Sequence, residues 1–267
     1  MKRALSGIAV MLLLASCATT TSPTGRRQLV GAISQQQLDR MGAQAFAETK
    51  AKQPQSRDGK QNAYVQCVVN ALVDQLPVQY RQVQWETALF IADEPNAFAL
   101  PGGKVGVNSG IFAVARNQDQ LAAVLGHEIG HVISRHHEER VTQQMGASSL
   151  VQIAGALAGA AYGETAGQAV SELGDTAAPV LLLRGSRTQE SEADVVGQRL
   201  MAQAGFDPAQ AVNLWQNMMA AGGARPPQWL STHPDPANRI QQLQHDVASL
   251  QPVYRQARQS GRTPHCG

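Results

Sequence analysis

The stretch H-E-I-G-H at residues 127–131 decides the fold of this chain. In an α-helix His127 and His131 project from one face, four residues apart, and their imidazoles can bind one metal ion. Glu128 then lies beside that ion, where its carboxylate can accept a proton from water. Zinc suits the arrangement, because imidazole nitrogen binds it well and three protein ligands leave one position open. A solvated helix face would match the same pattern in about one chain in a hundred, so the context has to support the motif.

The residues on either side of the motif predict a buried helix. Residues 117–120 (N-Q-D-Q) offer capping and first-turn residues. An apolar stripe at helical spacing follows: Leu121, Val124, Leu125, Ile129, Val132 and Ile133. Gly130 within this stripe costs about 1 kcal/mol relative to Ala, which a close approach of another backbone or of substrate would explain, as would packing alone.

The third metal ligand has to come from elsewhere, and a second predicted helix over residues 186–201 offers it. Glu190 and Asp194 are four residues apart and share a face of that helix. One carboxylate could bind zinc while the other accepts a hydrogen bond from a ligand histidine. The alternative is an acidic first turn that complements the helix dipole. Because the chain also contains H-E-x-x-H, a metal site is the better interpretation of Glu190 and Asp194.

These two motifs resemble the zinc metallopeptidases that include bacterial HtpX, the CaaX prenyl proteases and mitochondrial Oma1. The family pattern is H-E-x-x-H followed by E-x-x-x-D on a later helix. The resemblance implies that Glu190 is the third ligand of one Zn²⁺ per chain, that Asp194 supports His127, and that Glu192 faces elsewhere. It runs from about residue 60 to about residue 245 and is strongest to the short periplasmic lipoprotein branch of the family.

Two further segments match the family, and the first of them is residues 96–103 (N-A-F-A-L-P-G-G). Residues 83–92 are rich in β-branched and aromatic residues, and residues 104–107 predict a strand after the turn at 101–103. A strand beside a zinc helix can present a free edge to which a peptide substrate adds. The resemblance gives this substrate-binding role to the segment around Asn96 and Ala97, and an ordinary β-hairpin is the alternative.

A second matching segment contains Thr232, His233 and Pro234, followed by Arg239. His233 precedes a proline and is therefore expected in an extended or turn conformation. The family places here a group that donates a hydrogen bond to the oxyanion of the reaction. Arg239 is expected to support this loop or to bind substrate carbonyls. By contrast, His136 and His137 lie at the wrong helical angle to join the ligands, and we expect them to be surface or packing residues.

The amino terminus predicts a lipoprotein. Two basic residues precede an apolar run over residues 8–14, which ends in Leu-Ala-Ser-Cys17 and resembles a bacterial lipobox. We expect residues 1–16 to be a signal peptide, Cys17 to be lipidated, and residues 17–33 to include a flexible tether. A plain signal peptide with a chance cysteine is the alternative. Ala18 after the cysteine favours the outer membrane, on its periplasmic face.

Charge and cysteine content agree with this location. Loss of Lys2 and Arg3 with the signal peptide leaves 20 basic and 20 acidic residues, and no basic patch indicates nucleic-acid binding. Two cysteines remain, Cys67 and Cys266. In an oxidising periplasm they are expected to form a disulfide, with two free thiols as the alternative.

The sequence thus predicts an α+β fold over residues 34–267, a mainly helical zincin-type metallopeptidase domain with a small β-sheet or hairpin beside the active-site helix. The Ala- and Gly-rich residues 146–178 are expected to form a buried helical hairpin, or else a mobile flap. The expected function is zinc-dependent cleavage of misfolded or damaged periplasmic and outer-membrane proteins. The first alternative is a chaperone or assembly factor, which would work with the outer-membrane assembly machinery and without cleavage. A structural lipoprotein with a vestigial site is the second.

Overall fold

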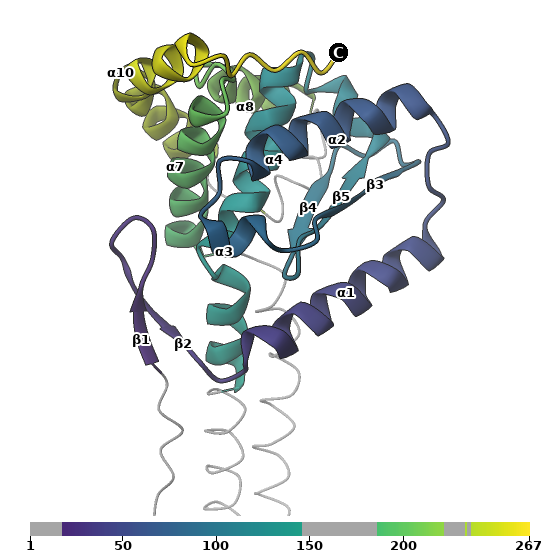
Figure 1. Ribbon diagram of the computed structural model, residues 1–267, viewed down its shortest axis with the longest axis vertical. Helices are drawn as coiled ribbons and strands as arrows, with labels where there is room; N and C mark the ends of the chain where they lie inside the picture. The colour runs from purple at the N-terminus through teal and green to yellow at the C-terminus, as the bar shows by residue number, and fades with distance from the viewer. Residues whose placement is uncertain (1–17, 146–185, 222–232, 234–235) are drawn as a thin grey trace, which may run out of the picture.

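The computed structural model describes residues 18–145, 186–221, 233 and 236–267. Within these ranges the chain is mainly helical with two small sheets, which confirms the predicted α+β class (Figure 1). The helices are α1 (Gln35–Lys52), α2 (Gly59–Val73), α3 (Val78–Arg81), α4 (Gln118–Ile133), α7 (Arg187–Gln203), α8 (Gln210–Ala221) and α10 (Pro236–Gln259). The strands are β1 (Ala18–Thr21), β2 (Arg27–Val30), β3 (Glu86–Phe90), β4 (Ala97–Leu100) and β5 (Lys104–Asn108).

Helix α4 carries the H-E-x-x-H motif through the centre of the molecule. It begins where the sequence predicts, because the side chain of Asn117 accepts a hydrogen bond from the backbone N–H of Gln120 at 2.9 Å. Its residues from Gln120 to His131 are all buried. The helix ends at Ser134, and Arg135 takes a left-handed conformation with φ of 56°. Residues 136–145 then form a second helical segment.

Helices α4 and α7 cross with their backbones in close contact, side by side in Figure 1. A Cβ atom added at Gly197 would lie 2.6 Å from the backbone nitrogen of His127, and one added at Gly130 would lie 2.8 Å from the carbonyl oxygen of Ala193. Neither site has room for a side chain. The close approach of another backbone, which Gly130 indicated, is therefore confirmed. This contact between the two helices brings the acidic face of α7 against the paired histidines.

The larger sheet of the described residues has the strand order β3-β5-β4. β3 runs parallel to β5, and β4 runs antiparallel to it after a turn that contains Gly102 and Gly103, both at positive φ. Residues 54–56 lie along the outer side of β3. The backbone N–H of Ser56 donates to the carbonyl of Leu89, and the backbone N–H of Ile91 donates to the carbonyl of Pro54. β4 contacts α4 and pairs on its outer side with no other described strand. The strand predicted at residues 104–107 is confirmed.

Residues 18–30 form an antiparallel hairpin of β1 and β2, where the sequence predicted a flexible tether. The reason is a set of long-range polar contacts. Glu192 of α7 accepts hydrogen bonds from Thr24, in the turn, and from Arg26, after it. Gln28 donates a hydrogen bond to the carbonyl of Ser134 at 2.6 Å. The hairpin therefore belongs to the folded domain (Figure 1).

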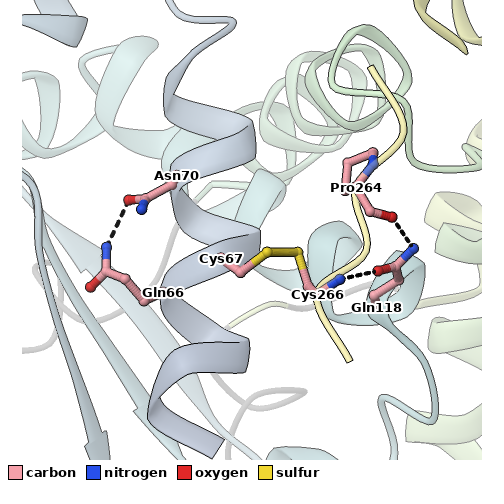
Figure 2. Close-up of a disulfide and its surroundings, with 6 residues drawn as sticks. All are labelled: Gln66, Cys67, Asn70, Gln118, Pro264 and Cys266. Carbon is pink, nitrogen blue, oxygen red and sulfur yellow. Dashed lines mark hydrogen bonds between the residues drawn. A yellow bond between two sulfur atoms is a disulfide. The ribbon is translucent and has the colours of Figure 1, made fainter. Parts of the chain in front are cut away.

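A disulfide joins Cys67 of α2 to Cys266 near the C-terminus, as Figure 2 shows. Their Cα atoms are 5.5 Å apart. Gln118, at the start of α4, holds the same C-terminal segment: its amide donates to the carbonyl of Pro264 and its carbonyl accepts from the backbone of Cys266, both at 2.9 Å. The expected pairing of the two cysteines is therefore present.

No helix among the described residues is both long enough and apolar enough to cross a membrane. Three expectations lie outside the described residues: the signal peptide over 1–16, lipidation of Cys17, and the helical hairpin or flap over 146–178.

Candidate metal centre

Four side chains converge where α4 crosses α7. The Nε2 atoms of His127 and His131 are 3.1 Å apart. The two oxygens of Glu190 lie 3.4 Å from His127 Nε2 and 3.5 Å from His131 Nε2. His233, which precedes α10, places its Nδ1 atom 3.2 Å from His127 Nε2 and 2.7 Å from Glu190 Oε2. One potential ligand atom from each of the four residues lies within 4.8 Å of the others.

This geometry fits a zinc ion. Ligand atoms at about 2.1 Å from zinc in a tetrahedral arrangement are about 3.4 Å from one another. Glu190 is fully buried, and its Oε1 atom has no hydrogen-bond partner among the described residues. Because buried carboxylate oxygens are normally satisfied, an ion between this oxygen and the two imidazoles would supply the missing partner.

Asp194 and Arg239 support the centre from behind. The Nδ1 atom of His127 lies 2.9 Å from Asp194 Oδ1, as expected for a carboxylate that orients a ligand histidine. Arg239 donates two hydrogen bonds to Asp194, at 2.5 and 2.7 Å, and a third to Glu190 at 3.1 Å, with its guanidinium 4.1 Å from the ring centre of Trp215. Arg239 is only 4% exposed. It therefore clamps the two carboxylates. Its Nη1 atom also donates to the carbonyl of His233 at 3.4 Å, in agreement with the expected support of that loop, and its role in binding substrate carbonyls stays a prediction.

The charges of the metal-free centre are set by these contacts. Burial would raise the pKa of Glu190, but its contacts with the three imidazoles outweigh burial and hold this pKa well below its usual range. Burial and Arg239 lower the pKa of His127, whereas Asp194 and Glu190 raise it, with a net result of about 9. Burial holds the pKa of His131 well below its usual value. Without an ion, the centre thus keeps a proton on His127.

His136 is the residue that reasoning from the sequence missed. It is fully buried, with its Nδ1 atom 2.8 Å from Nδ1 of His131 and its Nε2 atom 3.1 Å from Glu192. The angle expected for it assumed an unbroken helix. The left-handed turn at Arg135 breaks that helix and returns His136 towards the centre. It lies outside the group of four potential ligands, but it is neither a surface residue nor simple packing.

The remaining predicted residues lie around the cluster. The carboxylate of Glu128 lies 3.4 Å from Nε2 of His233. Ala97 begins β4 with its side chain buried, and the Asn96 carbonyl accepts a hydrogen bond from the backbone of Asn108 at 2.9 Å. Along an antiparallel ladder, every second residue forms hydrogen bonds with the partner strand. Because Asn96 bonds to β5, the backbone N–H and C=O groups of Ala97 and Ala99 face away from β5, on the outer edge of β4. Ala97 can therefore serve a substrate through its backbone.

The profile of peptidase family M48 matches residues 59–247, which is most of the chain and includes α4 and α7. The chain belongs to peptidase family M48. This confirms the resemblance that the two motifs indicated. The metallopeptidases of family M48 use zinc, in agreement with the geometry of the ligand atoms.

Individual relatives of this M48 chain include organellar and bacterial enzymes. The mitochondrial metalloendopeptidase OMA1 of Schizosaccharomyces pombe is 40% identical over 171 residues, which are 63% of this chain and 48% of that protein. OMA1 of Saccharomyces cerevisiae is 31% identical over 196 residues, 71% of this chain and 53% of that protein. The beta-barrel assembly-enhancing protease of Escherichia coli is 32% identical over 166 residues, which are 60% of this chain and 34% of that protein. The chain thus matches about half or less of the length of these curated relatives.

Proposed function

We propose that this M48 chain is a zinc-dependent endopeptidase. The observation that carries the proposal is the convergence of His127, His131 and the unsatisfied oxygen of Glu190 at distances that fit one tetrahedral ion. A zinc ion held there supplies a Lewis acid that activates water and polarises the substrate carbonyl.

The residues of the chain perform the remaining steps. Glu128 accepts the proton of the attacking water and then delivers it to the leaving amine. Its position on the turn that carries His127 places it beside the ion. The Nδ1–H of His127 donates to Asp194, so its Nε2 lone pair is directed at the ion. Arg239 in turn fixes Asp194.

The position of the His233 ring limits the role that this residue can have. Its Nδ1 atom lies among the ligand atoms, where a fourth ligand of a tetrahedral ion would stand. With an ion bound here, water or substrate could take that position only if the ring moved away from Glu190. The role of His233 as a hydrogen-bond donor to the oxyanion stays a prediction that requires this movement.

The outer edge of β4 is the proposed substrate-binding site. The backbone groups of Ala97 and Ala99 on this edge can pair with an extended peptide, as another strand would. Because β4 also packs on α4, a peptide added there would run beside Glu128 and the ligand histidines. Pairing through backbone groups favours extended or unfolded proteins as substrates over any one side-chain sequence.

We infer that the enzyme acts in the bacterial cell envelope, on misfolded or damaged periplasmic and outer-membrane proteins. Three observations support this: the lipobox-like sequence before Cys17, the disulfide between Cys67 and Cys266, and the similarity to a relative named beta-barrel assembly-enhancing protease. In this proposal the lipid on Cys17 holds the domain at the periplasmic face of the outer membrane, near the assembly machinery of that membrane.

The decisive experiment compares Glu128→Gln with the wild type. The variant should bind one zinc per chain and fail to cleave an unfolded protein, because it keeps the ligands and loses the base. Glu48→Gln, the same change at an exposed acid on α1, is the matched control and should cleave normally. Retained cleavage by Glu128→Gln would refute its assigned role. Rescue of envelope defects in cells by Glu128→Gln would favour the chaperone alternative.

A further inference from the structure

The β1–β2 hairpin ends in a cluster of buried charges. The guanidinium of Arg26 donates to Glu192 through Nε at 2.7 Å and to both oxygens of Glu139 through Nη1 and Nη2 at 2.8 Å. Thr24 donates its hydroxyl hydrogen to the other oxygen of Glu192 at 2.6 Å. Both carboxylates are only 4% exposed, and the guanidinium of Arg26 compensates their charge.

From Glu192 the contacts continue to the metal centre. The Nε2 atom of His136 lies 3.1 Å from the Glu192 oxygen that Arg26 also contacts, and its Nδ1 atom lies 2.8 Å from Nδ1 of His131. The chain of contacts therefore runs Arg26, Glu192, His136, His131, and every link is shorter than 3.2 Å.

Hydrogen bonding makes the two tautomers in this chain depend on each other. When His131 binds a metal through Nε2, its Nδ1 carries the hydrogen and needs an acceptor. The facing Nδ1 of His136 accepts only if the hydrogen of that ring is on Nε2. That Nε2–H then needs its own acceptor, which is Glu192. A carboxylate held in place by Arg26 and Thr24 thus selects the tautomer of His136 that His131 requires.

We propose that Arg26 is a positioning residue for the metal centre, which fixes the orientation of His131 through Glu192 and His136 and so controls how tightly the metal ion is held. The β1–β2 hairpin becomes part of the metal site although it contributes no ligand. The inference rests on the proposed function, since His131 has to be a ligand.

A purely structural role for Arg26 is the competing explanation. In that case removal of Arg26 would destabilise the domain, because two buried carboxylates would lose their cation, and the properties of the bound metal would stay the same. The two explanations differ in the metal-dissociation rate, in the visible spectrum of a cobalt-substituted site, and in the tautomer of His136. None of these readouts depends on catalytic activity.

The first test measures zinc release to a chromogenic chelator from the full chain. Arg26→Ala should release zinc faster than the wild type, by at most about the ten- to hundred-fold that loss of the direct outer partner of a metal-bound histidine costs in affinity. Arg27→Ala, at the exposed next residue, which begins β2, is the matched control and should release zinc at the wild-type rate. In the cobalt-substituted protein, only Arg26→Ala should change the d–d absorption bands. Folded Arg26→Ala with unchanged zinc release and an unchanged cobalt spectrum would overturn the proposal.

The second test keeps the hairpin intact, in case Arg26→Ala does not fold. In His136→Asn the amide oxygen replaces the Nδ1 acceptor, whereas His136→Leu offers no acceptor. Zinc release should stay near the wild-type rate in His136→Asn and should accelerate in His136→Leu. Nitrogen-15 NMR of the wild-type imidazoles should show His136 protonated on Nε2. Equal zinc release from the two variants, or the opposite tautomer, would overturn the proposal.

The failure of this inference and the failure of the proposed function are distinguishable. If the wild-type chain binds no zinc, or Glu128→Gln still cleaves, the proposed function fails. If the wild type binds zinc and cleaves while the Arg26 and His136 variants hold zinc as the wild type does, only the positioning role fails.

Discussion

Gly197 of α7 touches the backbone of His127 in α4: a Cβ atom added to the glycine would lie 2.6 Å from the histidine nitrogen. The same Cβ would lie 2.7 Å from the carbonyl of Gly126. These neighbours are backbone atoms in a buried helix, so they cannot rotate away as a flexible side chain could. The separation of the two helices, and with it the distance from Glu190 to the paired imidazoles, depends on this contact.

Gly197→Ala should therefore force α7 away from α4. We expect a loss of about 1–3 kcal/mol in the free energy of unfolding, which is typical of overpacking, together with weaker zinc binding. Thermal or denaturant unfolding and zinc content per chain measure the two effects. Gly59→Ala is the matched control, because nothing lies within 4 Å of the Cβ added there. Normal zinc affinity in Gly197→Ala would show that the helix crossing does not set the site geometry.

The affinity for zinc should depend on pH through His127. The carboxylates of Asp194 and Glu190 outweigh burial and Arg239, and they raise its pKa from 6.5 to about 9 in the metal-free protein. A metal ligand has to be deprotonated, so each ion that binds below pH 9 displaces a proton. The apparent affinity should then rise about tenfold per pH unit from pH 7 to pH 9 and level off above that.

Calorimetry in buffers of different ionisation enthalpy measures this proton directly. At pH 7 the zinc-binding enthalpy should vary with the buffer, with a slope of about one proton released per ion. His131 adds no second proton, since burial keeps its pKa well below the usual value. A slope of zero at pH 7 would contradict the protonated state assigned to His127.

The parts of the site that the sequence predicts are those set by local periodicity. His127 and His131 share a helix face because they are four residues apart, and the same holds for Glu190 and Asp194. That these two faces meet does not follow from spacing. It was expected from the family resemblance, and Gly126, Gly130 and Gly197 make it physically possible.

The parts that could not be predicted depend on long-range contacts or on an unusual backbone conformation. Arg135 adopts φ of 56° although it is not a glycine, so no residue marks the end of α4 or the return of His136. The hairpin of residues 18–30 looks like a polar tether because its stabilising partners, Glu139 and Glu192, lie more than a hundred residues away. The sequence places Arg239 near the site, but it does not indicate that the side chain is buried with its guanidinium over the ring of Trp215.

The disulfide should stabilise the domain without taking part in catalysis. Cys67 and Cys266 are separated by 199 residues, and closing a loop of that length contributes about 5 kcal/mol in the chain-entropy model. Cys67→Ser with Cys266→Ser should therefore unfold at lower denaturant concentration than the wild type, and reductant should shift only the wild type. Peptidase activity at 25 °C should persist in the folded variant, because the bridge lies at the start of α4, more than two turns before His127. Equal stability of the two proteins would show that the bridge adds nothing to the fold.

Substrate pairing with β4 should be detectable in the peptide backbone. If Ala97 and Ala99 present their outward backbone groups to an extended substrate, methylation of the substrate amide nitrogens that pair with them should lower kcat/KM by about three- to tenfold each, the value of one lost hydrogen bond. Methylation at the intervening positions should have little effect, since alternate residues of an added strand face away from β4. The comparison needs one cleavable peptide methylated at each position in turn. A uniform decrease along the peptide would contradict strand addition, because steric hindrance alone has no two-residue period.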